Sequence, residues 1–471
     1  MRPNLAAQTL QRDGGSFRDP DGFVFRQGDR VFRAVLPAAA KRWREFAASG
    51  LATELERAEL MVATAEVDPT PFLAELELPA GSLVLEHERV PFISYPYEWS
   101  FDMLRDAALL ELEILERCLR HGWILKDATA YNVQFLGARA RFIDVLSFAP
   151  VQTGEPWAGY SQFCRLLLYP LMLEAYLHVP FQFWLRSELE GIDPAVFGRL
   201  FRGLRKLRPG VLAHVTAQAY LQQTFSGAGY SVRKEIKSAG MTTAMIARNV
   251  RSLRKLLNRM RAPATGTWTE YSRAHYGDEA LVRKESFVSE VLAGRRYDLV
   301  WDLGCNDGHF SRIALPSART VVAMDADAGA INTLYRRQVS EQQAGILPLV
   351  LNVANPSPRQ GWASAERASL ADRGKPDLTL ALALAHHVAI TANVPLAALV
   401  EWLADSSREV LIEFIAKDDP MVQRLLLNKE DTYLGYDREN FERCLQGFFL
   451  ITRHAELPGG TRTMYHAVAA R

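Results

Sequence analysis

Cysteine is scarce in this sequence, and the few that occur follow no recognisable spacing. The 471 residues include four cysteines, and no two of them form a C-x-x-C pair. This absence argues against a zinc site and against a disulfide framework, and it fits a reducing cytoplasm. The four are Cys118, Cys164, Cys305 and Cys444.

Long uninterrupted apolar runs are also lacking. Residues 1–15 contain no sustained apolar stretch, so we expect no secretory signal. The most apolar run, residues 166–185, is interrupted by Pro170, Glu174 and Pro180, which would be costly in hydrocarbon. We therefore predict a buried pair of helices there, no transmembrane segment, and a soluble, cytoplasmic protein.

Neither sign of charge dominates, since the net charge is +1. Residues 263–471 carry 22 Lys and Arg against 26 Asp and Glu, whereas residues 1–262 carry 33 against 28. A mildly acidic C-terminal part argues against a nucleic-acid substrate, which normally requires a basic face. The chain also exceeds the roughly 250–300 residues that one core supports. We predict two domains, residues 1–262 and 266–471, separated where Pro and Gly interrupt the helical pattern.

The N-terminal part combines a few strands with many helices. Residues 16–36 alternate apolar and polar positions around turn residues and predict short antiparallel strands. Helical periodicity runs from Ala38 to about Ala65, and an extended piece is expected over residues 90–97. A long helix is predicted over residues 101–120, and residues 157–261 are almost entirely helical in pattern.

The last of these helical stretches, residues 241–261, is basic and amphipathic. Its apolar residues share one face, and Arg248, Arg251, Lys255 and Arg259 lie elsewhere. Such a helix is suited to a membrane surface or a polyanion. The alternative is a helix that simply packs on its own domain.

Strands and helices alternate in the C-terminal part, which predicts a mostly parallel sheet covered on both faces. The last two strands flank L-P-G-G and predict an antiparallel hairpin. The expected strands are residues 299–303, 321–324, 347–351, 378–384, 410–414, 448–452 and 463–469.

The most informative segment is L-V-W-D-L-G-C-N-D-G-H-F-S, residues 299–311. An apolar strand ends there on Asp302, and Gly304 and Gly308 let the backbone turn and approach a ligand. The next strand delivers Asp325, 21 residues after Gly304, to the position where ribose hydroxyls are usually held. The turn lacks the third glycine of a pyrophosphate-binding G-x-G-x-x-G, so the ligand need not be a dinucleotide.

This pattern resembles class I S-adenosylmethionine-dependent methyltransferases over about residues 266–471, including the strand order and the terminal hairpin. The resemblance implies a seven-stranded Rossmann-like sheet, S-adenosylmethionine as cofactor, and no metal in this half. It also implies that Asp325 binds the ribose diol and that Asn352, where the family often has an aspartate, lies beside the adenine amine. The implied cofactor-binding residues are Asp302, Gly304, Asn306, Gly308, Asp325 and Asn352.

His386 and His387 follow the fourth strand of the predicted sheet, at the edge where open α/β sheets bind ligands. Either could take a proton from an acceptor, since imidazole titrates near neutral pH, or the pair could be structural. Glu413, Lys417 and Asp418 follow the fifth strand as further candidates for acceptor contact. An aromatic cluster before the first motif could cover a ligand or pack between the halves; it contains Trp268, Tyr271, His275 and Tyr276.

Residues 121–148 contain Asp127, an asparagine five residues later, and a strand pair that ends on Asp144. This segment resembles the catalytic loop of protein-kinase-like and aminoglycoside-kinase-like enzymes. The resemblance implies an α+β, largely helical domain in which Asp127 is the base and Asn132 and Asp144 hold magnesium with ATP. No glycine-rich phosphate loop precedes it, and Arg33 takes the place of the usual lysine. A degenerate fold used for binding therefore remains an alternative.

The sequence thus predicts an α/β methyltransferase that acts on a small molecule or glycan precursor, preceded by a kinase-like module. A bifunctional enzyme that also uses ATP and magnesium, and a methyltransferase whose N-terminal half only binds a partner, are the competing hypotheses. The combination looks like a bacterial group of methyltransferases, some of them nodulation-related. The methyl acceptor and the oligomeric state are not encoded in any recognisable pattern.

Overall fold

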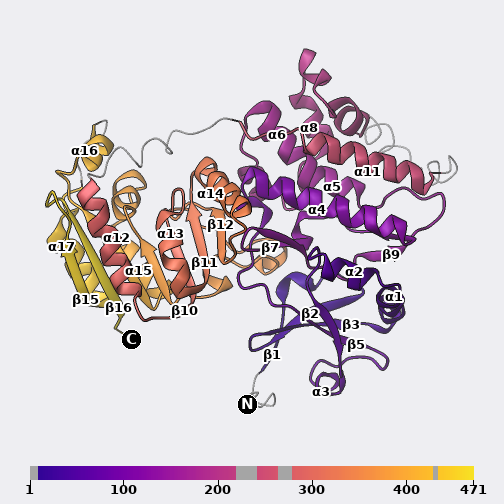
Figure 1. Cartoon of the computed structure of the whole chain (residues 1–471), viewed down its shortest axis with the longest axis horizontal. Helices are drawn as coiled ribbons and strands as arrows, with labels where there is room; N and C mark the ends of the chain where they lie inside the picture. Colours follow the sequence, from indigo (N-terminus) through magenta and orange to yellow (C-terminus); the bar gives the residue numbers. More distant parts are fainter. Residues whose placement is uncertain (1–8, 219–240, 264–277, 428–432, 471) are drawn as a thin grey trace.

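Two large sheets, one from each half of the chain, organise the molecule (Figure 1). The structure is a computed structural model that describes residues 9–218, 241–263, 278–427 and 433–470. The expected aromatic cluster at residues 268–276 lies outside these residues, as does most of the segment that separates the two predicted domains. The division into residues 1–262 and 266–471 therefore stays a prediction.

The N-terminal sheet has five antiparallel strands in the order β1-β2-β3-β5-β4. The hairpin expected over residues 16–36 is confirmed as β2 and β3. The extended piece expected at residues 90–97 forms no strand, and its end is a 3-10 helix, η3 (Pro96–Glu98). The strand that pairs with β3 lies earlier in the chain, at β5. The strands are β1 (Leu10–Arg12), β2 (Gly22–Gln27), β3 (Arg30–Val35), β4 (Thr64–Val67) and β5 (Leu83–His87).

The rest of the N-terminal half consists mostly of helices, with two small antiparallel sheets. These pair β6 (Trp123–Leu125) with β9 (Phe148–Pro150) and β7 (Val133–Leu136) with β8 (Arg139–Phe142), so the strand pair expected before Asp144 is confirmed. The helix predicted over residues 101–120 is confirmed with the same bounds as α4 (Phe101–Arg120), whose inward face carries twelve buried residues. The pattern from Ala38 to Ala65 is interrupted at Gly50, which has φ +79°, and its end is strand β4. The other helices are α1 (Pro37–Ala48), α2 (Leu51–Arg57), α3 (Thr70–Leu73), α5 (Tyr160–Phe163), α6 (Tyr169–Leu177), α7 (Gln182–Ser187), α8 (Pro194–Leu200) and α11 (Thr243–Leu257).

The basic helix α11 packs its apolar side against α4, which leaves its basic side on the surface. Ile246, Val250 and Leu253 are buried in the contact. Arg254 pairs with Glu116 of α4 across it.

The C-terminal sheet has seven strands in the order β12-β11-β10-β13-β14-β16-β15. Five strands are parallel, and the expected terminal hairpin is confirmed as the antiparallel pair β15 and β16. The predicted strands are all present with shifted ends. They are β10 (Tyr297–Leu303), β11 (Ala318–Asp325), β12 (Ile346–Val350), β13 (Leu378–Ala381), β14 (Glu409–Ile415), β15 (Phe449–Glu456) and β16 (Arg462–Ala469).

The two faces of this sheet are covered differently. Side chains of α12 (Asp278–Leu292) and α13 (His309–Ala314) fill a core on one face. On the other face α15 (Leu396–Ser406) and α17 (Arg438–Phe448) contribute to a larger core. The helix α14 (Ala328–Ser340) connects β11 to β12.

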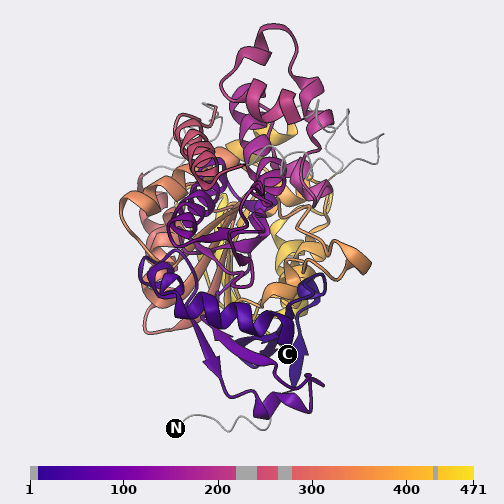
Figure 2. The same ribbon diagram turned by 90° about the vertical axis from the view of Figure 1, so that its right-hand side faces the viewer.

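The connection from β12 to β13 has no α-helix, only two single 3-10 turns, η9 (Trp362–Ser364) and η10 (Ala371–Arg373). The N-terminal half contacts the sheet in its place; Figure 2 looks along the long axis, with the N-terminal half in front of the C-terminal sheet. Phe92 meets Trp301 of β10 edge-on with ring centroids 6.3 Å apart. One hydrophobic core consequently runs through both halves, from Val35 to Ala467.

Within the described residues, no helix is long and apolar enough to cross a membrane.

Candidate cofactor site at the carboxyl edge of the C-terminal sheet

The turn after β10 is built from left-handed backbone positions. Gly304 has φ +73° and Gly308 has φ +76°, and Asn306 between them has φ +49°. At Gly308 an added Cβ would lie 2.5 Å from Leu334 Cδ1 of α14, so this glycine is required by helix packing as well as by its φ. The glycine turn inferred from the sequence therefore forms, and it lies beside the end of β11.

Asp325 ties this turn to the neighbouring strand. Its two carboxylate oxygens accept the backbone N–H groups of Asn306 and Asp327, each at 2.8 Å. Burial raises the pKa of Asp325, and these backbone N–H donors oppose that rise. Each oxygen keeps a further lone pair, so the carboxylate can still accept from a diol. The structure gives it a second role, which is to hold the turn.

Asp302 is more deeply placed than the sequence suggested. Its side chain is 2% exposed, and its Oδ2 accepts the Ser311 hydroxyl of α13 at 2.5 Å. Burial raises the pKa of Asp302 to about 6. The residue therefore joins the end of β10 to the first turn of the next helix.

Asn306 carries a polar atom that the protein leaves unsatisfied. Its Oδ1 is buried and accepts no hydrogen bond from the described residues. Such an atom usually marks a missing partner, because an unpaired buried acceptor is costly. Asn352, after β12, is exposed and its Oδ1 accepts the Ala354 N–H at 2.9 Å.

His386 and His387 lie side by side after β13, with ring centroids 4.2 Å apart. His386 is 1% exposed, and neither of its ring nitrogens has a hydrogen-bond partner among the residues that the structure describes. Burial lowers its pKa well below the usual value, and the neighbouring His387 and Arg462 act in the same direction. Burial also lowers the pKa of His387, whose side chain is only partly buried. Both rings are thus neutral at pH 7.

A buried ion pair that the sequence analysis missed lies next to the histidines. Lys284 of α12 and Glu413 of β14 approach to 2.6 Å, with side chains 2% and 0% exposed. The same Glu413 oxygen accepts the N–H of Ala383, three residues before His386, at 2.8 Å. Lys284 precedes the buried Phe287 and Val288 by three and four positions. A lysine on the apolar face of α12 is a sequence signal for a buried charge on this helix, but it does not identify Glu413 as the partner.

A match over nearly the whole chain identifies the family. The sequence is 35% identical over 468 residues to nodulation protein NoeA of Rhizobium meliloti (strain 1021), covering 98% of this chain and 96% of that protein. The chain belongs to the family of nodulation protein NoeA. No protein-family model matches it.

Solved structures similar to this member of the NoeA family include two methyltransferases. One is N-methyltransferase NodS from Bradyrhizobium japonicum WM9, at 10% identity, 41% coverage of this chain, 98% coverage of that chain and a TM-score of 0.31. The other is magnesium protoporphyrin IX methyltransferase from Synechocystis PCC 6803 with bound SAM, at 17% identity, 44% and 92% coverage, and a TM-score of 0.31. Scores this low assign no activity.

The N-terminal half of this NoeA-family chain contains a separate cleft of about 1020 Å³, and Asp127, Asn132 and Asp144 all line it. The three residues singled out in the sequence are therefore brought together. The β12–β13 connection forms another wall of the cleft, through Glu366 and Arg367 among others.

Of the two candidate magnesium ligands in this cleft, Asp144 is already engaged by protein groups, whereas the Asn132 side chain uses only its amide nitrogen within the part of the chain that the structure describes. Arg33 pairs with Asp144 at 2.9 Å, and Asn132 Nδ2 donates to Ser147 Oγ at 3.2 Å. Burial raises the pKa of Asp127, and the nearby Asp144 adds to the rise. Among the described residues, no group of three or more His, Cys, Asp or Glu side chains is arranged to hold a metal ion.

Proposed function

We propose that this chain is an S-adenosylmethionine-dependent methyltransferase that acts on a small molecule or a glycan precursor. The observation that supports it best is the pairing of Asp325 with the glycine turn at the carboxyl edge of β10 and β11. Ligands bind at this edge in open α/β sheets. The unsatisfied Oδ1 of Asn306 on the same turn supports a polar ligand there.

In this proposal the turn residues hold the methionine portion of the cofactor. Asp325 accepts bonds from the ribose diol, and Asn352 accepts from the adenine amine. Bound S-adenosylmethionine supplies an electrophilic methyl group, so the protein mainly has to align the acceptor with it and exclude water. Alignment of this kind is worth roughly 7–11 kcal/mol.

The two histidines have different roles in the proposal. His387 is partly exposed and neutral, so it can accept a proton from an acceptor hydroxyl or amine. His386 is buried and orients its neighbour. Replacement of His387 by Gln would then lower turnover with little change in cofactor affinity. Full activity of both single Gln variants across neutral pH would leave the pair with a structural role.

Calorimetry with S-adenosylhomocysteine tests the cofactor assignment. Asp325→Ala should weaken binding more than tenfold, because each hydrogen bond to a charged group contributes about 1.5–3 kcal/mol. Asp327→Ala is the matched control, since the Asp327 side chain caps α14 through the Gly329 and Ala330 N–H groups and is not assigned to the ribose in this proposal. Failure of the wild-type protein to bind, or equal affinities for Asp325→Ala and wild type, would remove the proposal.

The acceptor is the second part of the proposal. The relative in Rhizobium meliloti is named a nodulation protein, and we extend that context to this chain. An untargeted comparison of metabolites from cells with and without the protein should reveal one product in which a methyl group has replaced a proton, heavier than its precursor by one CH2 unit. A methylated nucleic acid as the only difference would contradict the proposed acceptor class.

A second candidate function, nucleotide binding by a kinase-like N-terminal half, is favoured by the convergence of Asp127, Asn132 and Asp144 on one cleft. Positioning of phosphates supplies most of the catalysis in phosphoryl transfer. The Arg33–Asp144 ion pair and the absence of a glycine-rich loop favour weak binding or partner recognition over catalysis.

A thermal-shift assay with ATP and magnesium on the full chain tests this candidate, because the core extends through both halves. A ligand at 100 times its dissociation constant stabilises a protein by about 2.7 kcal/mol. A shift that Asp144→Asn abolishes supports a working nucleotide site. No shift at millimolar ATP leaves recognition as the role of the cleft.

A further inference from the structure

The outer end of the N-terminal half carries exposed leucines within a strongly basic segment. Residues 199–212 follow α8 and include the short helix η6 (Gly203–Leu207) and the start of η7 (Val211–Thr216). Leu204, Leu207 and Leu212 are 84%, 68% and 53% exposed. Apolar side chains exposed together in this way usually mark an interaction surface.

The charge around these leucines has one sign only. The described residues 194–218 and 241–263 contain eleven Lys and Arg and no Asp or Glu. The exposed cations in residues 199–212 are Arg199, Arg202, Arg205, Lys206 and Arg208. None of these five forms an ion pair within the described residues; Arg208 stacks over Tyr176, 5.7 Å from its ring centre.

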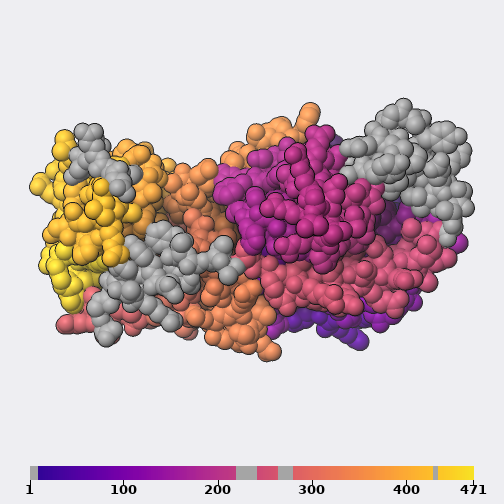
Figure 3. All heavy atoms as spheres, turned by 90° about the horizontal axis from the view of Figure 1, so that it is seen from above, coloured from indigo at the N-terminus to yellow at the C-terminus, as the bar shows by residue number. Residues whose placement is uncertain are grey.

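The helix α11 extends this surface. Gly210 lies against Leu256 of α11, which places residues 199–212 next to the end of that helix. The side of α11 that faces away from α4 carries Arg248, Arg251 and Lys255, and Arg259 follows the end of the helix; all four are exposed. Figure 3 shows the two segments side by side on one face of the molecule. Figure 1 shows the segment that follows α8 projecting beyond the rest of the N-terminal half. We call residues 199–212 and the outward side of α11 the basic face.

We propose that the basic face docks on a membrane surface that contains anionic lipids. The cations meet lipid headgroups, and Leu204, Leu207 and Leu212 enter the boundary of the acyl chains. A membrane fits better than a nucleic acid, because nucleic-acid backbones offer no apolar environment for three exposed leucines. An anionic lipid surface therefore accounts for both features of the basic face, its positive charge and its exposed leucines.

Sedimentation of the full-length protein with lipid vesicles tests the proposal. The protein should bind phosphatidylcholine vesicles that contain phosphatidylglycerol, and should not bind phosphatidylcholine alone. High salt should weaken binding because it screens the headgroup charge. The triple variant Arg202→Ser, Arg205→Ser, Lys206→Ser should lose affinity by about fivefold for each cation removed.

The leucines need their own variant and control. The double variant Leu204→Ser, Leu207→Ser should weaken vesicle binding at least tenfold, and it should fold normally because both side chains are exposed. Leu450→Ser, at a leucine of β15 that is 67% exposed, is the matched control and should bind like wild type. The control for the cation variant is the triple variant Arg319→Ser, Arg408→Ser, Arg443→Ser, which replaces three exposed arginines of the C-terminal half.

Three results would overturn the proposal. They are no binding to anionic vesicles, equal binding by the leucine variant, and binding lost equally in the two charge-removal variants. A single-stranded nucleic acid that binds tightly regardless of the leucines, with no vesicle binding, would assign the basic face to a polyanion instead. All readouts are binding measurements and do not depend on methyl transfer.

Discussion

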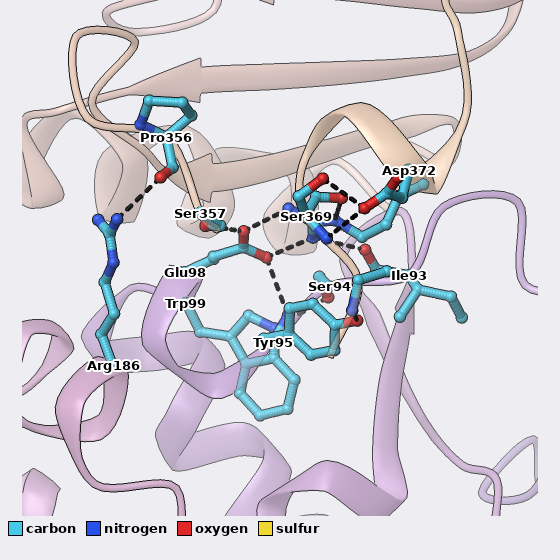
Figure 4. Close-up of polar contacts among 12 residues, drawn as sticks. Ile93, Ser94, Tyr95, Glu98, Trp99, Arg186, Pro356, Ser357, Ser369 and Asp372 are labelled. Carbon is cyan, nitrogen blue, oxygen red and sulfur yellow. Dashed lines mark hydrogen bonds and ion pairs between the residues drawn. The ribbon is translucent and has the colours of Figure 1, made fainter. Parts of the chain in front are cut away.

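Arg373 and Glu98 form a buried, two-pronged ion pair that joins the β12–β13 connection to the N-terminal half. Their N–O distances are 2.7 and 2.6 Å, and the side chains are 2% and 1% exposed. The Glu98 carboxylate also accepts the Ser357 hydroxyl at 2.5 Å and the Tyr95 N–H at 3.0 Å (Figure 4). The two halves are therefore linked by a charge pair with no access to water.

Replacing one member of this ion pair should strongly destabilise the folded protein. We expect Arg373→Met to lower the free energy of unfolding by about 3–5 kcal/mol, because Glu98 would remain buried without its counter-charge. Arg359→Met is the matched control on the same connection, since the Arg359 side chain is 64% exposed and pairs with Asp372; it should cost less than about 1 kcal/mol. Denaturant unfolding measures both, and similar costs would contradict the prediction.

The glycine turn offers a test of packing that does not need a ligand. Gly308→Ala should destabilise the protein by about 1–2 kcal/mol for the left-handed backbone and by a further ~1–3 kcal/mol for the contact with Leu334. Gly294→Ala is the control, because Gly294 has φ +71° and open space around the position of a Cβ. Gly294→Ala should lower the free energy of unfolding only by the cost of the left-handed backbone. Equal effects at the two glycines would mean that α14 moves away freely.

Asp302 should give the protein a measurable pH dependence. Its pKa is raised from an ordinary 3.8 to about 6, chiefly by burial, so the folded state holds the proton more tightly than the unfolded state. The stabilisation by the protonated form is complete below pH 4 and is lost as pH rises through 6, a change of about 3 kcal/mol. Asp302→Asn should remove this slope between pH 4 and 6 in unfolding experiments. An unchanged slope would place the responsible group elsewhere.

His386 should make stability depend on pH in the opposite direction to Asp302. Burial lowers its pKa well below 6.5, so the unfolded chain takes up a proton that the folded protein excludes. Its contribution to stability is present above pH 6.5 and declines as pH falls below that value. The melting temperature of wild type should therefore fall faster than that of His386→Gln on acidification. Parallel curves would show that His386 accepts a proton in the folded state.

Much of the sheet in the C-terminal half could be predicted from the sequence, because its strands are short, apolar and separated by helical patterns. The bounds of α4 could likewise be predicted, from the helical spacing of its apolar residues. The strand β5 was missed because its pairing with β3 depends on a register across the sheet, of Val31 with His87, that no local pattern encodes.

The site was partly predictable for the same reason. Asp325 and the glycines lie at strand ends, and strand ends can be located along the chain. The Lys284–Glu413 pair could not be found in this way, since its members are 129 residues apart and meet only when α12 packs on the sheet. The sequence around Glu366 and Arg367 likewise contains no local pattern that predicts their position in the wall of the N-terminal cleft.

The missing helix between β12 and β13 has a consequence for how the protein is made. The surface that covers Trp301 belongs to the part of the chain that leaves the ribosome first. Phe92 and the residues around it are therefore synthesised before β10, and we expect the later strands to assemble against them. A gene that encoded the second half alone would still supply α15 and α17 to that face of the sheet, but it would leave Trp301 without Phe92 and make the product prone to self-association there.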